Sequence, residues 1–257
     1  MKHYEALVDL GCFSRRDAVE LSGSEAAAAS LIHSYKKKGL IQSVRRDLFV
    51  TVSMETKQPV ANRFAIGSHI ASDACITHHS AFAYYGYANQ VFYEIYVASG
   101  ARFREFEFDG YLYRHLPLVS DSLITKRGDK VSVSEIERTV VDNIADFEKV
   151  AGLEELLCCL ELIPFLDAPK LLDYLKERDI AFLWQKVGYI LEHFSEHLQL
   201  PDSFFAECIR HLPKGKRYLF GGYRREPLQF ERRWQLYVPP NLMGLLSQGG
   251  VEYDSYK

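Results

Sequence analysis

The sequence has no long apolar run and no recognisable export signal. In its 257 residues, no hydrophobic stretch approaches the roughly 20 residues that a membrane-spanning helix needs. Its start, Met1-Lys2-His3-Tyr4-Glu5, lacks the apolar region of a signal peptide. We therefore expect a cytoplasmic protein that does not bind a membrane.

Cysteine is scarce and shows no pairing pattern. The chain has five cysteines, which is an odd number, and none belongs to a Cys-x-x-Cys motif. A disulfide framework or a zinc site usually shows such regular spacing. We expect five buried thiols in a reducing compartment: Cys12, Cys75, Cys158, Cys159 and Cys208.

The common catalytic motifs are also missing. The sequence contains no Gly-x-Ser-x-Gly, Gly-x-x-x-x-Gly-Lys or Gly-x-Gly-x-x-Gly, the turns that expose a nucleophile or surround a phosphate. Phe108-Asp109-Gly110 matches the kinase metal-binding tripeptide only in its letters, because no glycine-rich or catalytic loop accompanies it. His193 and His197 are spaced like zinc ligands on a helix, but Phe194 replaces the glutamate of a zincin. We expect no catalytic residue, metal or cofactor.

The charge is distributed unevenly along the chain. The net charge is −3, yet residues 1–52 carry 8 Lys/Arg against 6 Asp/Glu, a net of +2. Residues 53–150 carry 10 against 13, and residues 151–257 carry 13 against 15. The N-terminal segment is therefore the mildly basic part of an acidic protein, which suits a small DNA-binding head.

The segment from Phe13 to Val52 has the pattern of a helix-turn-helix. Ser14 can cap a short helix over residues 15–21, and Ser22-Gly23 breaks that helix. A second helix starts at Ser24-Glu25, where Ser22 and Glu25 are also spaced like a capping box, and ends at Gly39. One face of the second helix is predicted to be buried, because apolar residues recur there at i, i+3, i+4 and i+7: Ala28, Leu31, Ile32 and Tyr35.

Two strand-prone runs, at residues 40–44 and 48–52, follow this helix and flank the tip Arg45-Arg46-Asp47. A helix that can enter the major groove, beside a hairpin that can reach phosphates, is a winged helix-turn-helix. The alternative is a winged fold that contacts only protein. The predicted DNA-binding residues are Arg15, Arg16, Ser24, Ser30, His33, Ser34, Lys36, Lys37, Arg45 and Arg46.

A polar stretch from Ser53 to Gln58, followed by Pro59, predicts a junction between domains at residues 1–58 and 59–257. The predicted fold class is α+β: an N-terminal winged helix-turn-helix, then a mixed α/β body with a largely helical C-terminal part. The predicted elements of the body are helices at 60–72 and 78–85, strands at 91–98, 103–108 and 111–116, edge strands at 123–125 and 130–133, helices from 134 to about 212 interrupted by Pro164, Pro169 and Pro201, and short strands at 216–221, 228–230 and 234–238.

Residues 134–142 predict a helix with two local polar pairs. Ser134 and Glu137 have the spacing of a capping box. Arg138 and Asp142 are one helical turn apart and are expected to form an ion pair on the surface.

Two blocks of opposite charge follow. Residues 152–208 hold 11 Asp/Glu against 4 Lys/Arg, and residues 210–233 hold 8 Lys/Arg against 2 Asp/Glu with aromatic residues between them. The basic block is either a surface for a partner or a nucleic acid, or it neutralises the acidic helices. Its candidate contact residues are Lys214, Lys216, Arg217, Arg224, Arg225, Arg232 and Arg233.

Two segments, Ile76–Gly86 and Val133–Asp142, resemble the AbiEi-type antitoxins of bacterial type IV toxin–antitoxin systems when they follow a winged head in this order. The resemblance covers nearly the whole chain. It implies a protein of phage defence that represses its own operon through the head. Because one such head buries too little surface for tight specific binding, we also expect a dimer or cooperative pairing on the operator. It also implies that the body counteracts a nucleotidyltransferase-type toxin. The four alanines at residues 26–29 depart from a typical recognition helix.

Two other classes of function stay open. A DNA-targeted nuclease would need acidic residues clustered on strands, whereas Glu135, Glu137 and Asp142 are explained more simply by capping and ion pairing. A non-enzymatic adaptor would use the winged head for protein contacts, although the arginines of the wing favour DNA.

Overall fold

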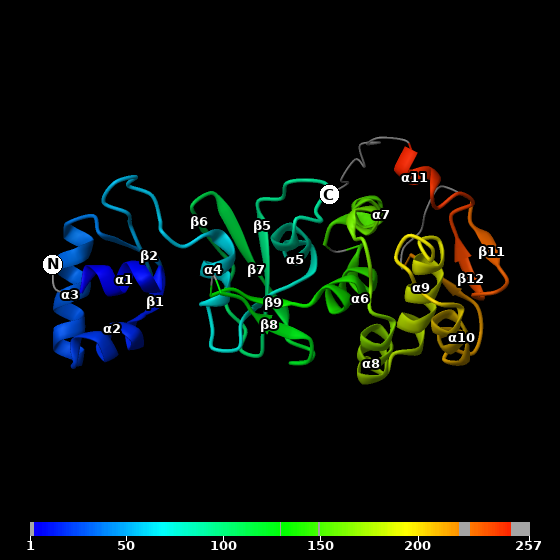
Figure 1. Ribbon diagram of the computed structural model, residues 1–257, viewed down its shortest axis with the longest axis horizontal. Coiled ribbons are helices and arrows are strands. Elements are labelled where there is room, and N and C mark those ends of the chain that lie inside the picture. Colours follow the sequence, from blue (N-terminus) through cyan, green and yellow to red (C-terminus); the bar gives the residue numbers. More distant parts are fainter. Residues whose placement is uncertain (1–2, 129, 149, 221–226, 248–257) are drawn as a thin grey trace. The chain divides into compact units, whose positions relative to one another are not determined.

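The computed structural model describes residues 3–128, 130–148, 150–220 and 227–247 (Figure 1). The chain forms two compact units. Unit 1 consists of Met1–Ser80 and Phe92–Ser134, and unit 2 consists of Ala81–Val91 and Glu135–Lys257. The predicted boundary between residues 58 and 59 lies inside unit 1 and stays a prediction. None of the helices in the described ranges is both long and apolar enough to cross a membrane.

The N-terminal part of unit 1 is a small α/β head. Its elements in order are α1 (Tyr4–Leu10), β1 (Cys12–Ser14), α2 (Arg15–Ser22), α3 (Glu25–Lys37), β2 (Ile41–Arg45) and β3 (Leu48–Thr51). The three strands form an antiparallel sheet in the order β1-β3-β2. The winged interpretation requires this order. The prediction missed β1, because three residues are too few to show a periodic pattern.

Side-chain caps set the helix boundaries of the head. Ser14 caps α2 and forms a reciprocal capping box with Asp17, while the Ser24 hydroxyl accepts from the Ala27 N–H at the start of α3. The predicted capping box of Ser22 with Glu25 is wrong, since the Ser22 hydroxyl ends α2 by donating to the Ala18 carbonyl. The predicted buried face of α3 is confirmed: Ala28, Leu31, Ile32 and Tyr35 are all buried.

The rest of unit 1 is a mixed six-stranded sheet in the order β6-β7-β5-β4-β9-β8. The pairs β5/β7 and β4/β9 are parallel, and the other neighbours are antiparallel. Its elements are α4 (Arg63–Ser68), β4 (Cys75–Ile76), β5 (Glu94–Ser99), β6 (Phe106–Phe108), β7 (Tyr111–Pro117), β8 (Ile124–Lys126) and β9 (Ser132–Ser134). The helix α5 (His78–Tyr85) begins after β4, and its residues from Ala81 onward belong to unit 2.

Local chemistry explains where these elements start and turn. Asp109 and Gly110 form the predicted two-residue hairpin, and both have positive φ, 51° and 77°, as a type I′ turn requires. The helix predicted over residues 60–72 is shorter, because Asn62 caps it and it ends at Ser68. The strand predicted at 130–133 is not at an edge, since β9 lies between β4 and β8.

Unit 2 is mainly helical and ends in a small sheet. Its sheet has the order β10-β12-β11, in which β10 is parallel and β11 antiparallel to β12. Trp234 is fully buried beside Gly188, where an added Cβ would lie 2.2 Å from the indole ring. The elements are α6 (Ile136–Asp146), α7 (Gly152–Leu162), α8 (Ala168–Arg178), α9 (Ala181–Glu192), α10 (Asp202–Arg210), β10 (Arg217–Tyr218), β11 (Gln229–Glu231), β12 (Leu236–Val238) and α11 (Gly244–Ser247). The predicted α+β class is confirmed.

Candidate functional site

The outward face of α3 carries polar side chains opposite its buried stripe. Ser30, His33 and Lys37 are exposed and recur at i, i+3 and i+7, so they share one side of the helix. Ser34 is half-buried next to them, and Ser24 is exposed but its hydroxyl already caps the helix. Ser30, His33, Ser34 and Lys37 therefore form one continuous face of α3.

The predicted cations of α2 are paired with carboxylates. The Arg15 Nε atom lies 3.1 Å from Glu25, and the Arg16 Nε atom lies 3.1 Å from Glu20. Both pairs are exposed, and such pairs are weak. A phosphate can displace these carboxylates, but the free energy of binding is then less favourable than at an unpaired cation. Lys36, by contrast, donates only to the Ser43 hydroxyl at 2.9 Å, which fixes it between α3 and the wing.

The two arginines of the wing have different surroundings. The Arg46 side chain is 94% exposed at the tip, with Asp47 3.5 Å away. Arg45 turns back: its guanidinium lies 5.6 Å from the Phe103 ring centre and 5.4 Å from that of Phe106, within the same unit. Cation–π contact of this kind holds a guanidinium in place. We therefore expect Arg46, and not Arg45, to be available for a phosphate.

Unit 1 also contains a cavity of about 1050 Å³ that the sequence did not predict. Its walls come from α2, from residues 68–74 and from the β8–β9 hairpin, segments far apart in the sequence. Charges of both signs line it, among them Arg16, Asp17, Asp73 and Lys126. No local sequence pattern signals a cavity built from three separate segments.

The basic strip of unit 2 is partly neutralised by the acidic helices. Arg233 pairs with Glu192 at 2.8 Å, and Arg210 pairs with Glu207 at 2.6 Å. Within the described residues, the other cations of the strip are exposed and make no ion pair. These are Lys214, Lys216, Arg217 and Arg232, whereas Arg224 and Arg225 lie outside the described residues.

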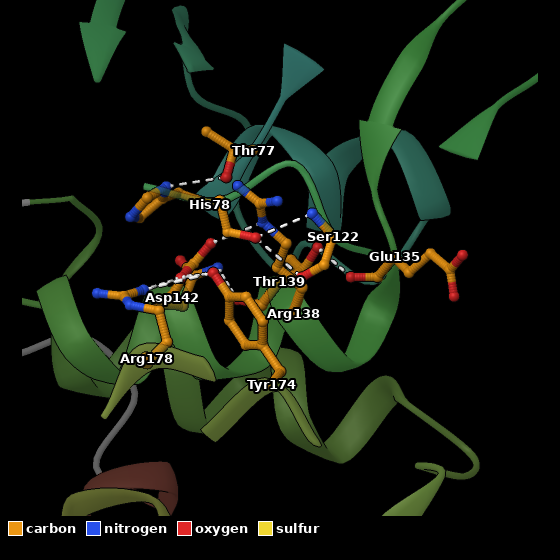
Figure 2. A network of polar contacts seen from close by, with 11 residues as sticks. Thr77, His78, Ser122, Glu135, Arg138, Thr139, Asp142, Tyr174 and Arg178 are labelled. Carbon is orange, nitrogen blue, oxygen red and sulfur yellow. Dashed lines mark hydrogen bonds and ion pairs between the residues drawn. The ribbon is translucent and has the colours of Figure 1, made fainter. Parts of the chain in front are cut away.

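A buried ionic cluster joins α6 to α8 (Figure 2). Arg138 and Asp142 are only 1% and 3% exposed, with Nε and Oδ2 3.2 Å apart. The other carboxylate oxygen of Asp142 accepts from the Tyr174 hydroxyl at 2.9 Å and from Arg178 Nη1 at 2.6 Å. The prediction of a surface pair is wrong, because α8 covers this face of α6.

Burial and neighbouring charges shift the pKa values of two members of the cluster, Tyr174 and Arg178. Burial raises the pKa of the Tyr174 hydroxyl, and the negative charge of Asp142 raises it further. Burial acts to lower the pKa of Arg178, but Tyr174 and Asp142 outweigh burial and raise that pKa. At neutral pH the Tyr174 hydroxyl therefore stays neutral and Arg178 stays charged, and the cluster cross-links α6 to α8.

The start of α6 also differs from the prediction. Ser134 lies in β9, and α6 begins at Ile136 without a side-chain cap. The Glu137 carboxylate is buried and accepts from the Asp167 N–H at 3.1 Å instead of capping its own helix. Glu135 pairs with Lys170 at 2.7 Å. Each of these two acidic residues thus supports the packing of α8 against α6.

Cys12, Cys208 and the pair His193 and His197 show no arrangement of reactive or metal-binding groups within the described residues. All five cysteines are free, but the prediction of five buried thiols is wrong for Cys158, which is only partly buried. Burial raises the pKa of Cys12 and Cys208 to about 12, so these two thiols are unreactive at neutral pH. His193 and His197 do not share a helix, because α9 ends at Glu192. The His193 Nδ1 atom lies 2.9 Å from the Tyr189 carbonyl oxygen.

Comparison with known proteins gives a fold and no family. No family model matches the sequence. No curated protein matches it either. Among solved structures, the chain is similar to the crystal structure of the RV2827C protein from Mycobacterium tuberculosis, with a TM-score of 0.61 and 13% identity over 96% of this chain and 92% of that chain. Similarity at this identity shows a shared α+β fold.

Proposed function

We propose that the head is a winged helix-turn-helix that binds double-stranded DNA. The observation that carries the proposal is the exposed polar face of α3, opposite a buried stripe and beside exposed cations. Lys36 and Lys37 end α3, and Arg46 extends from the wing next to it. A duplex that received α3 in its major groove would meet these cations along its phosphates.

Few groups on this face can read bases. The exposed Ala26 and Ala29 allow close approach and contact with thymine methyl groups, but they donate no hydrogen bond. Ser30 and His33 are the best donors, with Ser34 beside them. Because one small head buries little surface, tight specific binding needs paired heads on repeated half-sites.

The proposal extends to an antitoxin and autorepressor. Its support is the resemblance to AbiEi-type antitoxins at residues 76–86 and 133–142. In this reading the head represses the operon, and the body counters a nucleotidyltransferase-type toxin without catalysis of its own. A DNA-targeted nuclease is less well supported, since Glu137 binds a backbone amide and Asp142 two guanidinium groups and a hydroxyl.

Salt dependence of duplex binding tests the head. Each phosphate contact contributes about −0.9 to the slope of log K against log salt on B-DNA. Arg46→Ala is expected to weaken binding to promoter DNA and to reduce the steepness of that slope by about 1. Arg45→Ala is the matched control, because its guanidinium lies on Phe103 and Phe106.

Arg45→Ala is expected to leave the slope unchanged, whatever it does to affinity by loosening the wing. Fluorescence anisotropy with a labelled promoter duplex at four or more salt concentrations measures both effects. Equal slopes for wild type and Arg46→Ala would refute the assignment of the wing tip. A reduced slope for Arg45→Ala would place Arg45 on DNA after all.

A further inference from the structure

A row of aromatic rings crosses the small sheet of unit 2. Tyr218 of β10 is the partner of Tyr237 on β12, and Tyr237 is opposite Phe230 on β11. Cross-strand partners point to the same face of a sheet. The rings of Tyr218 and Tyr237 are stacked at 4.7 Å between centres and 15° between planes, and Phe230 lies 5.1 Å from Tyr237.

This row is on the outer face of the sheet. Leu236 and Val238, which flank Tyr237 on β12, are buried and point to the opposite face, as alternation along a strand requires. Tyr218 ends the row on an edge strand and is 57% exposed. One side of its ring stacks on Tyr237, and the exposure leaves the other side to solvent.

Cations surround the row. Lys216 shares the face of Tyr218, with its Nζ atom 4.6 Å from the Phe230 ring centre. Lys214 shortly before β10 and Arg232 directly after β11 are exposed and, like Lys216, make no ion pair within the described residues. Glu231 is the acidic residue of this sheet, and its carboxylate accepts from the Arg233 N–H. Among the residues that the structure describes, the outer face therefore combines an exposed aromatic ring with cations that make no ion pair.

We propose that this face binds single-stranded nucleic acid. A base stacks on the open side of Tyr218 and continues the stack of Tyr218 on Tyr237, while Lys214 and Lys216 meet the backbone phosphates. Stacking on an aromatic ring tolerates any base, and cations bind the backbone without reading it. A duplex is excluded, because its bases are already stacked and paired. An acidic peptide would use the cations and leave the ring without a role.

The test is binding of the full-length protein to fluorescein-labelled oligouridylate and oligothymidylate of ten nucleotides, measured by anisotropy. Tyr218→Leu keeps an apolar side chain but removes the ring, and is expected to weaken binding about tenfold. Tyr218→Phe and Tyr218→Trp keep a ring and are expected to bind within about twofold of wild type. Because Tyr218 is exposed, none of these changes disturbs the core.

A second variant tests the cations. Lys214→Gln with Lys216→Gln is expected to reduce the steepness of the salt slope by about 1.4, since each phosphate contributes about −0.7 on a single strand. Binding to either oligonucleotide supports the proposal, and preference for one identifies the natural strand. Alanine at Lys36, Lys37 and Arg46 is expected to leave this binding unchanged, so a failure of duplex binding by the head is a separate result.

Three outcomes would overturn the proposal. The first is absence of single-strand binding at low salt by the wild-type protein. The second is binding by Tyr218→Leu that equals that of Tyr218→Phe. The third is full displacement of the oligonucleotide by polyglutamate, together with equal polyglutamate affinity for the wild type and Tyr218→Leu. That result would assign the face to an acidic peptide.

Discussion

Replacing Asp142 with alanine is expected to destabilise unit 2 by about 3–5 kcal/mol, because it leaves two buried or nearly buried guanidinium groups without their shared carboxylate. Asp142 is the common partner of Arg138, Tyr174 and Arg178. Removing one member of a buried ionic cluster lowers the free energy of unfolding by far more than the whole cluster contributes to it, since the remaining charges stay out of water without a partner. The effect is large compared with the whole stability of a typical domain.

Urea unfolding followed by tryptophan fluorescence measures this change. The chain has two tryptophans, Trp184 and Trp234, and both belong to unit 2, so their signal reports this unit alone. Asp173→Ala is the matched control: Asp173 lies on α8, the helix that carries Tyr174 and Arg178, but its side chain is 80% exposed and lies 3.8 Å from Lys176. Its replacement is expected to change the free energy of unfolding by less than about 0.5 kcal/mol. If Asp142→Ala lowered the free energy of unfolding as little as Asp173→Ala does, the buried cluster would not stabilise unit 2.

Cells that express the partner toxin are expected to grow when they carry the full-length protein with alanine at Lys36, Lys37 and Arg46. This prediction rests on the proposed antitoxin function. The triple variant should lose duplex affinity on the order of 100-fold, since three charged contacts are removed. The residues that resemble AbiEi-type antitoxins outside the head are untouched, so rescue is expected to persist. The measured effect is large, because cells either grow or stop growing.

Both genes must be transcribed from unrelated promoters, so that repression cannot contribute to rescue. Asp142→Ala serves as the opposite control, because it leaves the head intact and is expected to abolish rescue through unfolding of unit 2. A folded triple variant that fails to rescue, while Asp142→Ala rescues, would reverse the proposed division of labour. Failure of both variants would show that rescue needs the cations of the head as well as an intact unit 2, which would also contradict the proposed division of labour.

Local features of this fold could be predicted from the sequence, and features that depend on distant segments could not. The stripe of Ala28, Leu31, Ile32 and Tyr35 was predicted because helical periodicity is contained within one turn or two. The Asp109-Gly110 hairpin was predicted because its backbone angles favour these residues. Neither prediction needed knowledge of any other segment.

The errors that concern functional residues come from packing between distant segments. The spacing of Arg138 and Asp142 gave the ion pair correctly, but only the packing of α8 on α6 makes it buried. Arg45 was predicted with Arg46 as a phosphate contact, yet aromatic residues more than fifty positions later hold its guanidinium. The cavity of unit 1 and the aromatic row of unit 2 likewise combine segments that no local pattern connects.

The burial of Trp234 constrains the order in which unit 2 can fold during synthesis. Its indole fills the space above Gly188 and donates to Glu192, and its carbonyl accepts from Gln185, so three residues of α9 depend on it. While the ribosome is still making the chain before residue 234, α9 has an open groove in its place. Domains that are synthesised first usually fold first. Here the packing of α9 is completed only after residue 234 has been synthesised, so α9 cannot reach its final packing when its own residues leave the ribosome.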